Sequence, residues 1–373
     1  MQRIDHVLAL STPGAQLTVT RWHFGMLGAR PKVFIQAALH ADELPGVLVA
    51  HEIKQKLEVL EQAGLLRGEV ILVPVANPIG LAQFQNSTQH GRFDGQTGRN
   101  FNRGFPDLVD AVAALIESQL TNSAENNLHI IRDALSCALQ QLTVNSQLEA
   151  LQCHLFDLAL DADLVLDLHC DSEADLHLYA HREQLPIVQV LGAYLGVAAI
   201  LYADEQGGQS FDDALTRQWY QLKKRFPSYP IPVGCTAVTV ELRGQSDVNI
   251  KMALADADAI IKFISWHSSP SANKVEALHT VQQKSTPLNF TEILASPISG
   301  IVSYTISYGV EVSPGTCLAV IVNPISGETL ELITQSGGIY YARNASRYVA
   351  AGTEVCFVAG DSIQRNTDNL LSS

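Results

Sequence analysis

The sequence predicts an α/β fold followed by a smaller all-β region, and three features support this prediction. Strand-like and helix-like segments alternate through the first two thirds of the chain, as is typical of α/β folds. The strand-like segments are almost continuously apolar, as expected where helices cover both faces of a sheet. The last third contains short strand-like segments separated by Gly and Pro turns. We therefore expect a mixed sheet flanked by helices, and then a β domain.

The elements of the α/β part follow one another along the chain. The first strand is rich in β-branched and aromatic residues, and a segment with apolar residues at helical spacing follows it. A mostly helical stretch at about 107–163 would be an insert over the site, a packing layer or a dimer surface. In the last case the protein would be a homo-oligomer. The predicted strands are 32–39, 69–78, 163–170, 176–180 and 236–244, and the predicted helices are 47–64, 107–120 and 128–142.

The last third carries an approximate internal repeat. Residues 299–321 match residues 337–358, with Gly315 aligned to Gly352. A repeated strand-turn-strand unit predicts a small two-fold sandwich, similar to the biotinyl/lipoyl barrel-sandwich domain. That fold carries its cofactor on a lysine, and no lysine follows Lys284. We therefore expect a structural or gating module.

A polar segment at 268–289 is typical of a linker between the two parts. We accordingly divide the chain into a catalytic α/β domain at 1–285 and a β domain at 286–373.

Composition excludes several classes of function. The net charge is −14, so a broadly basic surface for nucleic acid or for an anionic membrane is not expected. No apolar segment approaches the length of a membrane span. The N-terminal residues do not resemble a secretory signal, and the six cysteines are scattered without a CxxC pair. We expect a cytoplasmic protein with reduced thiols.

The sequence QAALHADELPG places a histidine and a glutamate just after the first predicted strand. His40 and Glu43 are three residues apart at a strand-to-helix turn, where their side chains can converge on one point. Imidazole nitrogen and carboxylate oxygen are both ligands of zinc. In the alternative interpretation, Glu43 lies in the first turn of a helix and interacts with the helix dipole.

His169 is the third candidate ligand. It lies near the end of a predicted buried strand, where side chains of an open α/β sheet face the ligand crevice. Two histidines and one glutamate are a ligand set of catalytic zinc. Asp42 and Asp167 are available to hold the ligand histidines. Alternatively, His169 is a core histidine bonded to Asp167 or to the backbone.

Glu241 is the candidate general base. It lies near the end of an apolar strand, where a carboxylate is costly unless it is paired or has a function. Hydrolysis at a zinc site needs a base for the attacking water. The alternative is an ion pair between Glu241 and Arg243.

Three arginines lie in the loop-like segment HGRFDGQTGRNFNRGFPD. Arg92, Arg99 and Arg103 have few acidic neighbours there, so a merely solvated loop explains them poorly. Arginine binds carboxylates in a two-pronged geometry. It can also stabilise the negative oxygen of a reaction intermediate.

Together these motifs resemble the succinylglutamate desuccinylase/aspartoacylase family, a branch of the zinc carboxypeptidase superfamily. They follow the family's order over about residues 30–265, and the C-terminal part also resembles that of the family. Two departures are HADE in place of HGDE, and Asn100 where the family often has aspartate. The motifs are HADE (His40, Glu43), ANP (Asn77, Pro78), NFNRGFP (Asn102, Arg103), DLHC (His169) and VEL (Glu241).

The resemblance implies a zinc-carboxypeptidase-like fold and a role for each matched residue. Glu241 would activate the water and later protonate the leaving amine. Asn102 and Arg103 match the pair that grips a substrate carboxylate. One zinc ion per chain would be bound by His40, Glu43 and His169.

The family also polarises the scissile carbonyl with an arginine that precedes this pair. Arg92 is the better match because an aromatic residue follows it, and Arg99 is the alternative. For the family's substrate-side tyrosine, Tyr304 and Tyr308 are candidates.

The implied activity is hydrolysis of the amide bond of an N-acyl amino acid or a similar small amide. One alternative is a metallocarboxypeptidase acting on peptides or peptidoglycan fragments. Another is a catalytically silent protein that binds zinc or a ligand. The ligand types also allow iron or another divalent ion.

Overall fold

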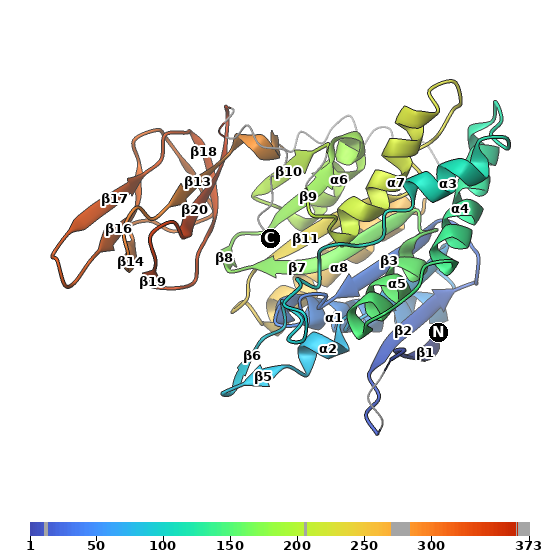
Figure 1. Ribbon diagram of the computed structural model, residues 1–373, viewed down its shortest axis with the longest axis horizontal. Coiled ribbons are helices and arrows are strands. Elements are labelled where there is room, and N and C mark those ends of the chain that lie inside the picture. The colour runs from blue at the N-terminus through green and yellow to red at the C-terminus, as the bar shows by residue number, and fades with distance from the viewer. Residues whose placement is uncertain (11–13, 205–206, 270–283, 363, 365–373) are drawn as a thin grey trace.

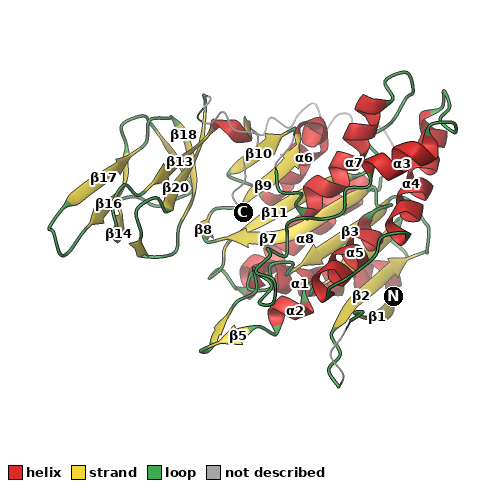
Figure 2. Cartoon of the chain, viewed as in Figure 1, coloured by secondary structure: helices red, strands yellow, loops and turns green. Residues whose placement is uncertain are grey.

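The computed structural model confirms a mixed α/β fold followed by a β-rich region (Figure 1). A nine-stranded sheet forms the centre of the larger part, and helices lie on both of its faces (Figure 2). The predicted linker falls largely outside the described residues. The structure describes residues 1–10, 14–204, 207–269, 284–362 and 364.

Parallel strands occupy the middle of the large sheet. β3, β7 and β11 run parallel, and β9 lies antiparallel to β11. The strand predicted at 69–78 is shorter in the structure, because Asn77 caps a short helix that begins at Pro78. In spatial order the strands are β1 (Gln2–Val7), β2 (Thr18–Gly25), β4 (Glu69–Val73), β3 (Lys32–Ala37), β7 (Leu164–Asp171), β11 (Thr236–Gly244), β9 (His177–His181), β10 (Ala199–Ala203) and β12 (Ser285–Pro287).

Alternation along the strands divides the core into two layers. Leu164 and Leu166 of β7 pack on the side of α1, α6 and α8, whereas Val165 packs on the side of α3, α4, α5 and α7. The helices of the 107–163 stretch therefore form a packing layer on the sheet. The helices are α1 (Leu44–Gln62), α2 (Pro78–Leu81), α3 (Val109–Ile116), α4 (Ala124–Gln140), α5 (Gln147–Ala159), α6 (Leu185–Leu195), α7 (Phe211–Arg225) and α8 (Ile250–His267), with 3-10 turns at Arg182–Gln184 and Leu288–Phe290.

The C-terminal region consists of two sheets built from the predicted repeat. Each repeat contributes three strands, and the first strand of each pairs with the middle strand of the other, β14 with β19 and β18 with β15. Gly315 and Gly352 both adopt positive φ, at +89° and +87°, which explains why both repeats keep glycine at this turn. The strands are β13 (Thr291–Ala295), β14 (Gly300–Tyr304), β15 (Val310–Val312), β16 (Cys317–Val322), β17 (Thr329–Ile333), β18 (Gly338–Arg343), β19 (Tyr348–Val349) and β20 (Glu354–Gly360).

The C-terminal region contacts the larger part through a short strand that follows β7. This strand, β8 (Glu173–Ala174), pairs with β18. Glu173 also forms ion pairs with Arg343 and Arg347, each at 2.6 Å. The chain that leaves β7 therefore adds a short strand to a sheet of the C-terminal region. The remaining strands, β5 (Phe84–Gln85) and β6 (Thr88–Gln89), form a hairpin of their own.

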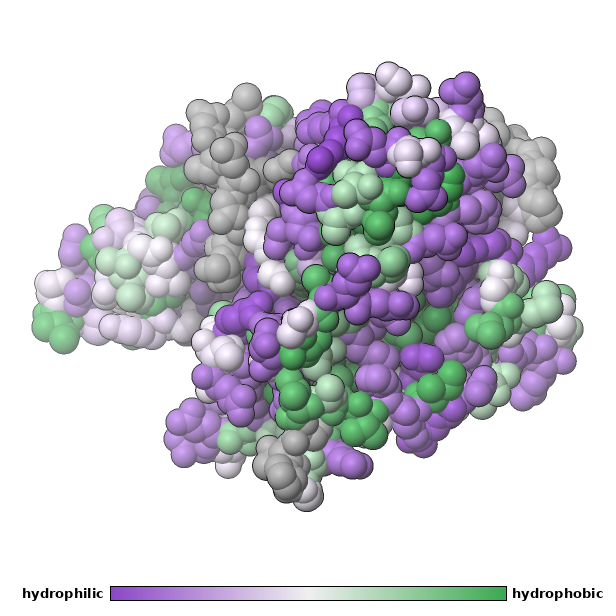
Figure 3. Space-filling model, turned by 45° about the vertical axis from the view of Figure 1, so that its right-hand side comes forward, coloured by the Kyte–Doolittle hydropathy of each residue, from purple (hydrophilic) through white to green (hydrophobic). Residues whose placement is uncertain are grey.

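The surface of the molecule is mixed in hydropathy (Figure 3). On the face shown in Figure 3, hydrophobic side chains lie in small groups among hydrophilic ones. Among the described residues, no helix is both long and apolar enough to span a bilayer.

One partly buried histidine makes the stability of this fold dependent on pH. His154 of α5 stacks on His6 of β1, with ring centroids 3.6 Å apart. Burial, together with His6 and Arg21, lowers the pKa of His154 to about 3. An unfolded histidine has a pKa of about 6.5. The unfolded chain therefore takes up the proton first, and the stability is complete above about pH 6.5 and is lost progressively between about pH 6.5 and pH 3.

The free energy of unfolding can be measured in urea at pH 7.5 and at pH 5. We expect its decrease between these two pH values to be larger in the wild type than in His154→Asn, by roughly 1–2 kcal/mol. The control is His129→Asn, which changes an exposed histidine of α4 and should follow the wild type. Equal losses in all three proteins would contradict this assignment.

Candidate metal centre and active site

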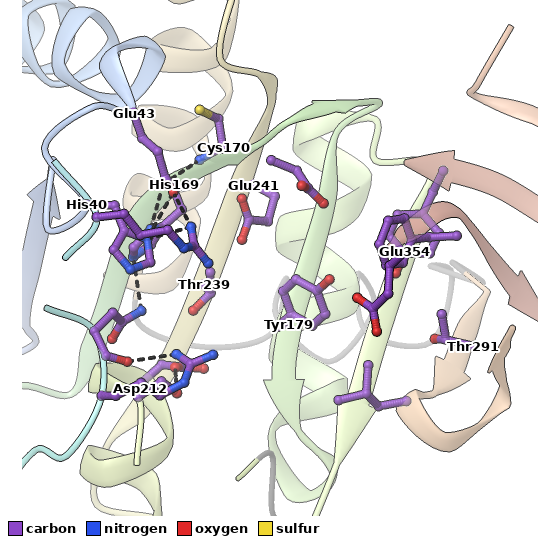
Figure 4. A pocket seen from close by; sticks show the side chains of 18 of the residues that line it. His40, Glu43, His169, Cys170, Tyr179, Asp212, Thr239, Glu241, Thr291 and Glu354 are labelled. Carbon is purple, nitrogen blue, oxygen red and sulfur yellow. Dashed lines mark hydrogen bonds and ion pairs between the residues drawn. The ribbon is translucent and has the colours of Figure 1, made fainter. Parts of the chain in front are cut away.

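The carboxylate of Glu43 is the centre of the candidate site. Glu43 precedes α1 but makes no capping hydrogen bond to it, and it is only 2% exposed. Its Oε1 lies 2.9 Å from His40 Nδ1, and its Oε2 lies 2.8 Å from His169 Nδ1. The backbone N–H of Cys170 donates to Oε2 at 3.1 Å. The three predicted ligand residues are thus brought together (Figure 4).

Oxygen atoms hold the outer ring nitrogen of each histidine. His40 Nε2 lies 2.8 Å from Asn100 Oδ1, which can only accept, so His40 Nε2 is the donor. His169 Nε2 lies 3.0 Å from Asp167 Oδ2, and Gln36 donates to the other oxygen of Asp167. Metal-ligating histidines are commonly oriented by partners of this kind.

Asp42 does not contribute to this support. Its Oδ2 accepts a hydrogen bond from Gln245 at 3.4 Å, and Asn100 is the residue that holds His40. One potential ligand atom from each of His40, Glu43 and His169 lies within 4.8 Å of the others, so this group could hold a metal ion.

The protonation states follow from burial and from the neighbouring charges. Burial acts to raise the pKa of Glu43, but the two imidazoles outweigh it and hold this pKa well below its usual value. Burial lowers the pKa of His40, which leaves a lone pair on Nδ1. Burial also acts to lower the pKa of His169, but Asp167 and Glu43 outweigh it and raise this pKa well above normal. A cation bound at His169 would displace that proton.

Glu241 lies beside the candidate metal centre. It is in register with His169 on the neighbouring strand, and alternation places Glu241 on the sheet face that carries His169 and Asp167. Its Oε2 is buried without a hydrogen-bond partner among the described residues. Burial, assisted by the charge of Glu43, raises the pKa of Glu241 well above its usual value. Arg243 instead pairs with Asp256 at 2.7 Å, so the alternative ion pair with Glu241 is not formed.

Arg92 reaches the site from the loop between β6 and α3. Its Nη1 lies 3.1 Å from Glu43 Oε1 and 3.2 Å from His40 Nδ1. The preceding Gly91 packs so closely that a Cβ there would lie 2.2 Å from the backbone nitrogen of Asp42. A larger residue would push this loop, and Arg92 with it, away from the HADE turn.

The other two predicted arginines lie in different surroundings. Arg103 lines the same cavity as Arg92, and its Nη1 donates to the backbone oxygen of Asn102. Asn102 is fixed by the backbone N–H of Phe211, which donates to its Oδ1 at 2.8 Å. Arg99 lies 3.5 Å from Glu149 and does not line the cavity.

The cavity has a volume of about 180 Å³ and is lined by both parts of the chain. The larger part contributes the residues described above. The C-terminal region and the segment before it contribute Leu288, Thr291, Ile293, Tyr341, Glu354 and Phe357. The pocket is therefore complete only where the two parts meet.

Two tyrosines in the cavity were not predicted from the sequence. Tyr179 of β9 and Tyr341 of β18 both line it, whereas Tyr304 and Tyr308 lie against Arg343 and do not. Tyr179 is in register with Thr239 on the neighbouring antiparallel strand. A prediction that these two strands pair could have indicated its position. The position of Tyr341 depends on how the C-terminal region packs, which no local pattern reveals.

Solved structures share this fold over nearly the whole chain. A protein of Shewanella amazonensis SB2B described as belonging to the succinylglutamate desuccinylase/aspartoacylase family is 26% identical, with a TM-score of 0.82 over 96% of this chain and 98% of that chain. A Shewanella frigidimarina NCIMB 400 protein of the same description is 25% identical, with a TM-score of 0.82 over 96% and 97%. The product-bound ectoine utilization protein EutE (DoeB) from Ruegeria pomeroyi shares the fold at 15% identity, with a TM-score of 0.66 over 96% and 95%.

No curated protein sequence matched the chain. A family profile described as the succinylglutamate desuccinylase/aspartoacylase catalytic domain matches residues 29–265, which is more than half of the chain. This range contains the predicted site residues His40, Glu43, Arg92, Arg99, Asn102, Arg103, His169 and Glu241, whereas Tyr304 and Tyr308 lie beyond it. The chain therefore belongs to the succinylglutamate desuccinylase/aspartoacylase family of deacylases.

Proposed function

We propose that this protein is a zinc-dependent hydrolase that cleaves the amide bond of an N-acyl amino acid or a similar small amide. Family membership supports a deacylase, and the buried group of two histidines and one glutamate supports a metal-dependent one. The observation that carries the proposal is Glu241, which is in register with His169 and whose Oε2 is buried without a hydrogen-bond partner in the described part of the chain. A carboxylate in this position is costly unless it takes part in the reaction.

One zinc ion per chain would be held by His40, Glu43 and His169. Three protein ligands are typical of catalytic zinc. When bound, zinc supplies a Lewis acid that polarises a carbonyl and lowers the pKa of water to about 7. Iron and other divalent ions accept similar ligands, so elemental analysis identifies the metal.

Each of the remaining site residues has a chemical role in this proposal. Glu241 takes a proton from the attacking water as the new C–O bond forms, and gives it to the amine nitrogen as the C–N bond breaks. Arg92 stabilises the negative charge that develops on the carbonyl oxygen. Asn102 and Arg103 bind a carboxylate of the substrate. Water is the only co-reactant, and the products are a carboxylate and a free amine.

We also propose that the C-terminal region is a barrel-sandwich domain that serves as a wall of the pocket. The crossed pairing of its repeats supports this architecture, and the lack of lysine beyond Lys284 argues against a carrier function.

Substitution of either histidine should remove the metal. In His40→Ala and His169→Ala, one nitrogen ligand is lost, and we expect the zinc content after dialysis to fall from about one per chain to near zero. Elemental analysis measures this directly, with His51→Ala, an exposed position of α1, as the control. Full zinc retention in both variants would show that these residues are not the ligands.

Glu241→Gln keeps the size of the side chain but cannot accept the proton from water. We expect kcat on a panel of N-acyl amino acids to fall about 100- to 10,000-fold, with zinc content unchanged. Activity close to that of the wild type would exclude Glu241 as the base.

Faster cleavage of short peptides than of N-acyl amino acids by the wild type would support the metallocarboxypeptidase alternative.

Arg103→Lys should weaken substrate binding, because lysine cannot contact a carboxylate in the two-pronged geometry. We expect KM to rise about tenfold or more. Arg99→Lys is the matched control, since Arg99 lies outside the cavity and its KM should change little. If Arg99→Lys were the more damaging change, Arg99 would be the carboxylate-binding residue.

A further inference from the structure

Carboxyl side chains outnumber arginines among the residues that line the cavity. Two arginines line it, Arg92 and Arg103, together with five carboxyl groups. Glu43 and Glu241 belong to the site described above, and Asp212 accepts a hydrogen bond from Ser210 at 2.7 Å. The other two, Asp171 and Glu354, form no ion pair with any described residue. The five carboxylates are Glu43, Asp171, Asp212, Glu241 and Glu354.

Glu354 brings its charge into the cavity from the C-terminal region. It is the first residue of β20, and its backbone oxygen accepts a hydrogen bond from Asn344 at 3.2 Å. Its side chain makes no hydrogen bond or ion pair with the described residues. Figure 4 shows its carboxylate pointing away from the C-terminal strands, toward Tyr179.

The basic residues that the structure describes in the C-terminal region are engaged elsewhere. Arg343 and Arg347 both pair with Glu173 at 2.6 Å. Arg343 also stacks over Tyr304 at 4.3 Å. No lysine follows Lys284, so no described side chain of this region neutralises Glu354.

Three aromatic side chains line the same cavity as this carboxylate. They are Tyr179, toward which the Glu354 carboxylate points in Figure 4, Tyr341 and Phe357. Aromatic faces attract cations, most strongly where water is excluded. A carboxylate among such rings is a combination that suits a positively charged ligand group and opposes a negatively charged one.

From this arrangement we infer that the end of the cavity at Glu354 receives a positively charged group of the substrate, such as an alkylammonium. The inference rests on the proposed function. The substrate is then an N-acyl amino acid with two opposite charges, a carboxylate bound at Arg103 and a cation bound at Glu354. A substrate with a second carboxylate in place of the cation would be repelled by Glu354 and Asp171.

The test uses pairs of substrates that differ by one charge at constant shape. The first pair is N-acetylornithine and N-acetylnorleucine, in which an ammonium replaces a methyl group of the side chain. The second pair carries the charge on the acyl half, as a 4-aminobutanoyl or a pentanoyl group on the same amino acid. N-acetylglutamate represents an anionic side chain. The readout is kcat/KM of the zinc-loaded wild type, Glu354→Gln and the control Glu311→Gln, which changes an exposed residue of β15.

We expect the cationic member of at least one pair to be hydrolysed about tenfold more efficiently than its neutral partner. In Glu354→Gln this ratio should fall several-fold, whereas Glu311→Gln should keep it. A wild-type ratio of one or less in both pairs would overturn the inference. A ratio that Glu354→Gln leaves unchanged would overturn it as well.

Binding separates this inference from the proposed hydrolysis. Calorimetric titration of the same compounds into Glu241→Gln should show tighter binding of the cationic member than of the neutral member. This difference in affinity should be smaller in the double variant Glu241→Gln/Glu354→Gln. If the wild type cleaves none of the amides but the binding preference is present, the cation site stands and the hydrolase proposal fails. If the amides are cleaved without any preference, the hydrolase proposal stands and the cation site is excluded.

Discussion

The buried charge of Glu43 determines how the site is built. A carboxylate that leaves water must be compensated by nearby hydrogen-bond donors and positive charge. Here the compensation comes from His169, the guanidinium of Arg92 and the backbone N–H of Cys170. These partners belong to the end of β7 and to the loop before α3, whereas Glu43 itself lies in the turn after β3. A single carboxylate thus joins three segments that are distant in sequence, and it leaves imidazole nitrogens facing the same point.

The period of the strands explains why the reacting groups share one face of the sheet. In β7 the leucines at 164, 166 and 168 pack under α1, α6 and α8, so Asp167 and His169 point to the other side. In β11 the same alternation places Glu241 on that side, in register with His169. The helical layer of α3, α4, α5 and α7 covers the apolar part of this face. The polar side chains lie at the strand ends beside the cavity.

The local sequence was sufficient to predict the site residues that lie at strand ends. His40, His169 and Glu241 each interrupt or end an apolar run, and the structure places all three at the cavity. Sequence favoured Arg92 but left Arg99 as an alternative, because both lie in one loop whose path depends on the close packing at Gly91. It also left the support of His40 by Asn100 unassigned, because that contact joins residues 60 positions apart. Tyr179, Tyr341 and Glu354 escaped prediction because their place in the cavity depends on how two parts of the chain pack.

The division of the pocket between these parts has a consequence for its chemistry. The proposed metal ligands, base and carboxylate-binding pair all come from the larger part, whereas Tyr341, Glu354 and Phe357 come from the C-terminal region. The strand pairing of β8 with β18 and the ion pairs of Glu173 hold the two parts together at the end of β7. Substitutions in the C-terminal strands can therefore change the charge and shape of the far wall while leaving the buried centre at Glu43 intact. In the proposed arrangement the reacting groups come from the larger part alone, whereas both parts line the region that would bind the substrate.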